Sequence, residues 1–298
     1  MAALLALGAA ATWGVGDFLG GLTSRRANEL VVTALSQVAG LLVLAVLLPL
    51  GGAAASGEAL AWGALAGLGG AGGLLAYFRA LAIGPMGVTA PVAALTGAVV
   101  PVVAGVLLGE RPGAIAWVGV AVGVAATVLA SRPAEEAVVH PEDHPELEVA
   151  PAGTSPEEVA SGADLRSGII AASVAGLLFG LFFVALDQAP SDAGLWPLLG
   201  ARGTGLTMIA VLLVARRPAR PDASATRMAL TSGLLDMAAN TLFLLAVQRG
   251  LLVLVSVLTS LYPVGVVLLA RIVLGERLGR GQQIGVVLAM LAVVLIAI

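Results

Sequence analysis

Apolar stretches long enough to cross a membrane fill almost all of this 298-residue chain. A membrane-spanning helix needs about 20 mostly apolar residues. Composition agrees: 59% of residues are hydrophobic and 11% are charged, with a mean hydropathy of +1.03, whereas soluble domains carry about 25% charged residues. The sequence therefore predicts an all-α integral membrane protein with ten transmembrane helices. The predicted spans are 2–23, 30–50, 59–82, 86–108, 113–131, 167–187, 194–215, 228–248, 251–274 and 281–298.

The chain also repeats itself. Leu-Gly-Glu-Arg occurs twice, at Glu110 and at Glu276, which are 276 − 110 = 166 residues apart, and the same shift superimposes Trp13-Gly14 on Phe179-Gly180. Matches at one offset across more than a hundred residues indicate duplication. We predict two repeats of five transmembrane helices joined by an acidic, flexible linker. Their bounds are 1–131 for the first repeat, 132–166 for the linker and 167–298 for the second repeat.

Five spans per repeat is an odd number, so the second repeat must enter the membrane in the opposite direction to the first. Inverted repeats of this kind are the architecture of many secondary transporters. Arginines cluster after the first, seventh and ninth spans, all on one side. Because basic residues favour the cytoplasm, this distribution predicts that both termini lie outside.

Several function classes lack the residues that they need. The chain has no cysteine, which excludes disulfides and thiolate chemistry. His140 and His144 both lie in the linker, where prolines oppose a helix that would align them for a metal. We therefore expect no enzyme activity, no metal, no other cofactor and no nucleic-acid partner. All fifteen basic residues are arginine, a bias typical of GC-rich bacteria, and we expect a bacterial plasma (inner) membrane location.

The candidate site residues among the ionisable groups within predicted spans are Asp17, Arg79, Arg202 and Asp236. Charged groups are costly in hydrocarbon, so they usually face the protein interior. Asp17 or Asp236 could bind a proton or a substrate amine, and Arg79 or Arg202 a carboxylate. Alternatively, an Asp and an Arg could pair with each other and only hold helices together. Arg79, near the end of its span, could extend to the membrane–water interface, and Asp17 could extend to water. Asn240 lies one helical turn after Asp236 and shares its face.

Further candidates are polar or aromatic. Gln37 shares a helical face with Thr33. The aromatic side chains of Trp13, Tyr77 and Tyr262 suit apolar or cationic substrates, although they could instead face lipid. Tyr262 precedes a proline that removes a backbone donor and weakens the helix there.

Two features favour structural roles. Span 59–82 carries a run of glycines over 67–73, which lets helices approach closely. The Glu110-Arg111 and Glu276-Arg277 pairs lie at helix ends, where each can cap or anchor a turn.

These motifs together resemble the EamA-type members of the drug/metabolite transporter superfamily. The resemblance rests on Trp13-Gly14, on Ala80-Leu81 followed by Gly84, on the two Leu-Gly-Glu-Arg segments, on Pro263 and on Arg202. It implies a ten-helix secondary transporter that exports or imports small metabolites, amino acids or drugs, with both termini in the cytoplasm. The chain departs from the family pattern at Gly97, where a proline matching Pro263 is usual, and at Gln37, where arginine is usual.

We therefore expect a secondary active exporter working by alternating access, coupled to protons or to exchange. Its partners would be a small-molecule substrate, protons and the lipid bilayer, and it would be a monomer or a homodimer. The alternatives are an uptake permease for a sugar or a nucleoside-like solute, or a membrane scaffold that transports nothing.

Overall fold

The computed structural model describes residues 1–50, 52–130, 162–275 and 279–297, and every regular element in them is helical. Two features from the sequence analysis lie outside the described residues. They are the histidines considered for a metal site, His140 and His144, and the helix-end pair Glu276-Arg277. The elements are α1 (Ala2–Ser24), α2 (Glu29–Leu47), the 3-10 helix η1 (Leu48–Leu50), α3 (Gly57–Ile83), α4 (Met86–Leu107), α5 (Ala114–Ala130), α6 (Gly162–Asp187), α7 (Trp196–Arg216), α8 (Ala223–Val247), α9 (Leu252–Thr259), α10 (Pro263–Leu274) and α11 (Arg280–Ala297).

Within the described residues, eight helical segments are long and apolar enough to cross a membrane, with α9 and α10 counted as one. A further apolar helix, Ala114–Ala126, is shorter. The all-α, multi-pass membrane class predicted from sequence is therefore confirmed.

Side-chain caps fix where several helices begin. The Asn28 side chain accepts a hydrogen bond from the Leu30 amide at the start of α2 (3.0 Å). Ser56 caps α3 and Asp222 caps α8 in the same manner. Such caps satisfy amides that have no partner inside the helix, so each of these helices begins at a residue specified by the sequence.

The predicted ninth span, 251–274, matches the candidate span Leu252–Leu274, but its helix is interrupted. It is divided into α9 and α10 by a turn at Ser260–Tyr262. Pro263 begins α10, where its missing N–H costs nothing, but it cannot continue the hydrogen bonding of α9. By contrast, α4 runs unbroken through Pro91 and Pro101.

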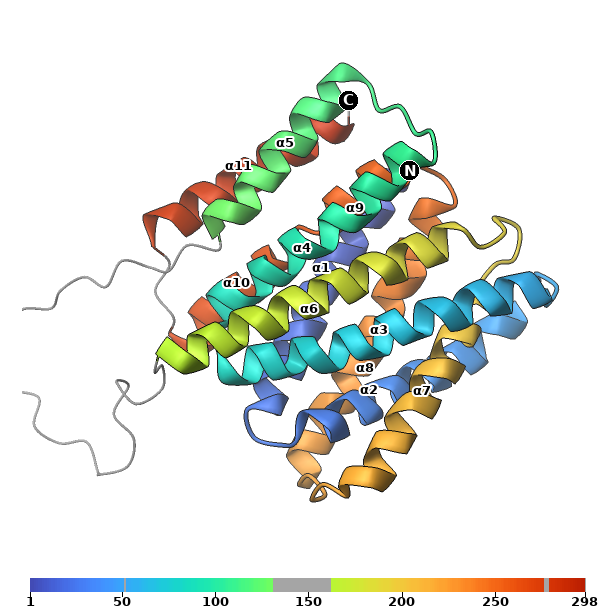
Figure 1. The fold of residues 1–298 in the computed structure, drawn as a ribbon, viewed down its shortest axis with the longest axis vertical. Helices are drawn as coiled ribbons and strands as arrows, with labels where there is room; N and C mark the ends of the chain where they lie inside the picture. Colours follow the sequence, from blue (N-terminus) through green and yellow to red (C-terminus); the bar gives the residue numbers. More distant parts are fainter. Residues whose placement is uncertain (51, 131–161, 276–278, 298) are drawn as a thin grey trace, which may run out of the picture.

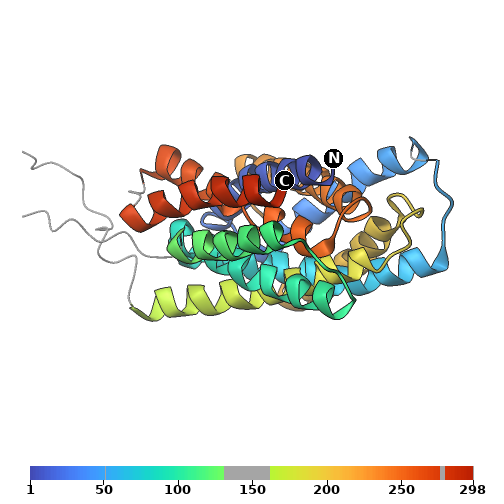
Figure 2. The ribbon, with the colours of Figure 1, turned by 90° about the horizontal axis from the view of Figure 1, so that it is seen from above.

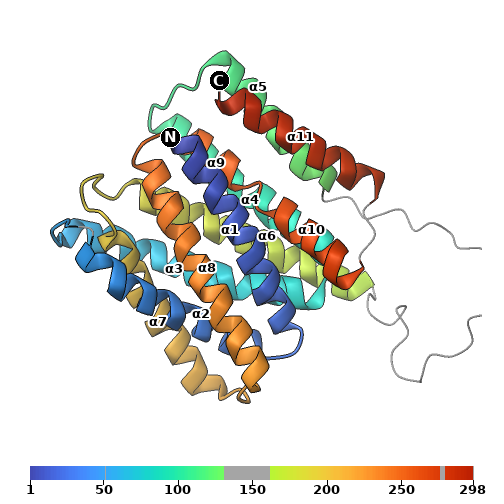
Figure 3. The same cartoon turned by 180° about the vertical axis from the view of Figure 1, so that it is seen from behind.

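The helices form two layers with one pair beside them. In Figure 1, α3, α4 and α6 lie in front of α1, α8 and α10, and Figure 3 shows the second group from the opposite side. Figure 2, seen from above, shows that the molecule is thin from front to back, along the direction in which Figure 1 is viewed. Helices α5 and α11 pack on each other beside the bundle and reach it through α4 and α9.

Contacts between the two halves of the chain come in matched sets. Helix α1 packs on α8 and α6 packs on α3; likewise α2 packs on α8 and α7 on α3. Helix α4 packs on α6, and α1 packs on both α9 and α10. In other pairs each helix meets its own counterpart: α2 with α7, α5 with α11, and α4 with α9 and α10.

The glycine run of α3 makes close backbone contacts with the second half, as predicted. A Cβ added at Gly67 would lie 2.3 Å from the Ala201 carbonyl oxygen of α7, and one at Gly69 would lie 2.6 Å from the Leu178 carbonyl oxygen of α6. Small residues let helix backbones approach to this extent. The glycines therefore set how near α6 and α7 lie to α3, and so where their side chains project.

Candidate functional site: a polar cavity between the two halves

A cavity opens where α1, α2, α3, α6, α7 and α8 meet the turn between α9 and α10. Its volume, measured as the space open to the centres of water molecules, is about 50 Å³, and one water needs about 10–15 Å³ by this measure. The polar residues that line it are Asp17, Gln37, Arg202, Asp236 and Asn240. The aromatic ones are Trp13, Phe179, Phe182, Phe183 and Tyr262, and the remainder are small or aliphatic: Gly67, Gly70, Ala71, Leu74, Leu198 and Ala201.

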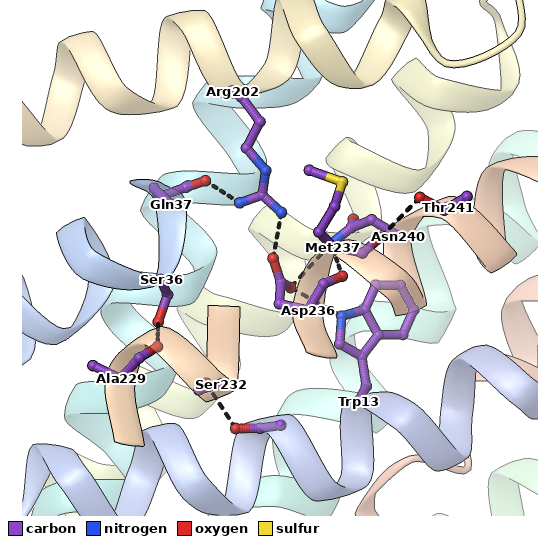
Figure 4. Close-up of polar contacts among 11 residues, drawn as sticks. Trp13, Ser36, Gln37, Arg202, Ala229, Ser232, Asp236, Met237, Asn240 and Thr241 are labelled. Atoms are coloured by element: carbon purple, nitrogen blue, oxygen red, sulfur yellow. Dashed lines mark hydrogen bonds and ion pairs between the residues drawn. The ribbon is translucent and has the colours of Figure 1, made fainter. Parts of the chain in front are cut away.

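Asp236 is the hub of a hydrogen-bonded network on one wall (Figure 4). Its Oδ1 accepts from Trp13 Nε1 at 3.1 Å and from Asn240 Nδ2 at 3.0 Å. Its Oδ2 accepts from the Arg202 guanidinium, which also donates to Gln37 Oε1. Helices α1, α2, α7 and α8 each supply one or more members, so this network joins four helices from both halves.

The backbones around this network are held by further side chains. Ser36 Oγ donates to the Ala229 carbonyl oxygen, joining α2 to α8 (3.1 Å), and Ser232 Oγ donates to the Gly16 carbonyl oxygen, joining α8 to α1 (2.8 Å). Gly40 faces the guanidinium of Arg202, where an added Cβ would lie 3.0 Å from Cζ. These contacts fix the orientation of the network before any ligand binds.

Asp17 is different, because its carboxylate makes no hydrogen bond or ion pair with the described part of the chain. The residue is only 6% exposed and lies one helical turn after Trp13 on α1. It lies close enough to Tyr77, Tyr262 and Asp236 for its charge to act on them. The buried hydroxyls of Tyr77 and Tyr262 make no hydrogen bond of standard geometry.

The structure brings most of the sequence-predicted site residues together. Seven of the nine line the cavity, namely Trp13, Asp17, Gln37, Arg202, Asp236, Asn240 and Tyr262. Tyr77 lies behind the wall, with its ring edge-on to that of Tyr262 at 5.9 Å. Arg79 lies away from the cavity, is 59% exposed and pairs with Glu29 (3.1 Å), which is the interfacial alternative considered above. Asp17 is buried in the cavity and does not reach out to water in the way considered for it.

Sequence reasoning missed the phenylalanines of α6 that form the opposite wall: Phe179, Phe182 and Phe183. The repeat offset could have found two of them, because Phe179 is the counterpart of Trp13 and Phe183 the counterpart of Asp17. The Phe183 ring packs 5.8 Å from Trp13 and 4.4 Å from Phe243.

Glu110 caps a helix in the other half of the chain. Its two carboxylate oxygens accept from the Leu252 amide (2.6 Å) and the Val253 amide (2.9 Å) at the start of α9. The capping role expected from its position is therefore present, and it joins the α4–α5 connection to α9.

Three comparisons place these features among known proteins. The search of curated proteins found no match. A solved structure, titled only as the crystal structure of a protein, matches over 99% of this chain and 95% of its own, with a TM-score of 0.67 and 20% identity, and so has a similar fold. The profile of the EamA-like transporter family matches residues 1–132 and 166–298. This chain, a multi-pass membrane protein, therefore belongs to the EamA-like transporter family.

Proposed function

We propose that this protein is a secondary active transporter that carries a small metabolite through the polar cavity by alternating access, and that export is its direction. The proposal includes ten spans in two inverted repeats, the second related to the first by the 166-residue offset. The family of the chain supports transport of small solutes. We place the protein in the plasma membrane of a bacterium, on the evidence of its composition.

One observation carries the proposal: counterpart positions of the two halves line the same cavity. Asp236 and Asn240 of α8 correspond to Gly70 and Leu74 of α3, and all four residues line it. Trp13 of α1 and its counterpart Phe179 of α6 line it as well. A site shared by two related halves is the arrangement in which an exchange of their conformations would move access from one side to the other.

The matched contacts of the helices agree with this. If each helix is replaced by its counterpart in the other half, the α1–α8 contact becomes the α6–α3 contact, and both contacts are present. The α2–α8 contact likewise becomes the α7–α3 contact, and both of these are present too. The chemistry of the two walls nevertheless differs, because one presents Asp236 and Asn240 where the other presents Gly70 and Leu74. A ligand with one polar end and one apolar end fits this asymmetry.

The lining of the cavity supports binding over catalysis. Among the described residues that line it there is no serine, threonine or histidine, and the single arginine is engaged by Asp236 and Gln37. The Asp236 carboxylate is fully hydrogen-bonded to protein groups. We propose binding and release, without a chemical step.

Counterflow in proteoliposomes tests the proposal. Liposomes carrying the purified protein would be preloaded with single unlabelled amino acids, sugars, nucleosides or amines, and uptake of the same labelled solute would be followed. A transporter gives saturable uptake that preloading accelerates, and protein-free liposomes are the blank. A scaffold gives no saturable uptake for any solute.

Two arginine variants provide a matched comparison. Arg202→Gln removes the guanidinium from the cavity, whereas Arg79→Gln removes one at the surface. We expect Arg202→Gln to lose counterflow and Arg79→Gln to retain it. Equal rates in the two variants would show that the substrate does not pass through this cavity.

A further inference from the structure

The charges that line the cavity do not balance. Among the described lining residues, Asp17 and Asp236 are the carboxylates and Arg202 is the cation, so the ionised set carries a net charge of −1. The guanidinium lies against Asp236, and Asp236 also accepts from Trp13 and Asn240. The excess negative charge therefore belongs to Asp17.

A buried carboxylate without a partner is costly, and the cost is relieved only by a counter-charge or by protonation. Asp17 is 6% exposed, and the charge that acts on it is the like charge of the Asp236 carboxylate. It faces a cavity with room for a ligand. A site of this type is complementary to a positively charged group that arrives from outside.

The surroundings of Asp17 favour an organic cation over a metal ion. Calcium and magnesium take six or more oxygen ligands, and no cluster of three or more His, Cys, Asp or Glu that could hold a metal lies in the described residues. The cavity instead presents aromatic faces, including Trp13, Tyr262 and Phe183. Aromatic faces attract ammonium groups and also accommodate the apolar remainder of an amine.

Two buried tyrosine hydroxyls add a second observation. Tyr262 is held beside α1 by the turn between α9 and α10: a Cβ on Gly14 would lie 2.9 Å from the Tyr262 carbonyl oxygen. The Tyr77 and Tyr262 hydroxyls are both buried, close to Asp17 and without a standard hydrogen bond. An ammonium group has three N–H donors, enough for the carboxylate and for hydroxyl oxygens.

We propose that Asp17 and Tyr262 form a subsite for the ammonium group of a small organic amine, which makes the transport site selective for cationic substrates. This inference rests on the proposed transport function for its physiological meaning. The binding event itself is independent of transport.

Three probes of similar shape test the charge selectivity directly on the wild-type protein. Isothermal titration of the purified protein in detergent would compare 2-phenylethylamine, 2-phenylethanol and 3-phenylpropanoate, which are cationic, neutral and anionic. We expect the amine to bind at least about tenfold more tightly than the alcohol, about 1.4 kcal/mol. Failure of the amine to bind, or equal or tighter binding of either other probe, overturns the proposal.

Two aspartate variants assign the effect to Asp17. Asp17→Asn should weaken amine binding by at least about tenfold and leave alcohol binding unchanged, because only the charge-assisted hydrogen bond is lost. Asp192→Asn, at an exposed loop position, should bind both as the wild type does. Unchanged amine affinity in Asp17→Asn refutes the assignment. If Asp17→Asn does not fold, Tyr262→Phe is the substitute, with the same expectation of a selective loss for the amine.

The failure of this inference and that of the proposed function have different signatures. Counterflow of some other solute with no amine binding overturns the amine subsite and leaves transport standing. Selective amine binding that depends on Asp17, without counterflow of any solute, supports the subsite and overturns transport.

Discussion

Gly67 on α3 offers the sharpest test of how this bundle is packed. A Cβ added there would lie 2.3 Å from the Ala201 carbonyl oxygen and 2.9 Å from its Cα. Cβ atoms essentially never approach other heavy atoms within 3.0 Å, so Gly67→Ala requires α3 and α7 to separate by about 0.7 Å or more. Because the obstructing atoms belong to a backbone, no side-chain rotation can relieve the clash.

The size of the effect follows from two opposing terms. Overpacking a close contact costs about 1–3 kcal/mol, and a rigid backbone neighbour favours the upper end. Replacing a helical glycine by alanine stabilises the helix by about 1 kcal/mol, because alanine has the higher helix propensity. We therefore expect Gly67→Ala to lower the free energy of unfolding by about 2 kcal/mol.

Gly72 on the same helix is the matched control. A Cβ there would meet Leu178 Cδ1 at 3.4 Å, an ordinary contact, so Gly72→Ala should raise stability by about 0.5–1 kcal/mol through propensity alone. Gly233 is the counterpart of Gly67 in the second half, and a Cβ on it would lie 2.3 Å from the Ser36 carbonyl oxygen. Gly233→Ala should therefore be as damaging as Gly67→Ala.

Equilibrium unfolding in mixed detergent micelles, titrated with sodium dodecyl sulfate and followed by circular dichroism, would measure all three variants. The reasoning predicts that Gly67→Ala and Gly233→Ala unfold at a lower denaturing-detergent fraction than the wild type and Gly72→Ala at a higher one. A Gly67→Ala protein as stable as the wild type, or a Gly72→Ala protein as unstable as Gly67→Ala, would refute it.

Other substitutions test the remaining contacts. Glu110→Gln loses the charge that caps α9 and should lower the free energy of unfolding by about 1–2 kcal/mol in the same titration, whereas Arg111→Gln should leave it unchanged. Arg202→Gln and Asp236→Asn each leave one buried charge unpaired and should each cost about 3–5 kcal/mol. The double variant should cost less than their sum, and simple additivity would contradict the pairing. Pro263→Ala restores a backbone donor at the turn after α9, so amide exchange at 260–262 should slow; an unchanged rate would mean that packing sets the turn.

The helices and much of the cavity could be read from sequence, for identifiable reasons. Hydrophobic length determines where a span lies, and side chains such as Asn28 and Asp222 determine where it starts. A charged residue within a span points inward because lipid excludes it, which is how Asp17, Arg202 and Asp236 could be found. The same rule wrongly kept Arg79 among the site candidates. A long side chain near a helix end can reach the surface as easily as the protein interior.

The sequence alone determined that this is a membrane protein built from a duplicated unit, because both properties are written in hydrophobic length and in a constant offset between motifs. It could not determine which charges meet. Asp17 and Asp236 look alike in the sequence, and only the packing of α2 on both α7 and α8 brings Arg202 to Asp236 and leaves Asp17 without a partner. Interactions between residues far apart in the chain depend on how closely helix backbones approach, and that distance is set in three dimensions by contacts such as Gly67 on Ala201.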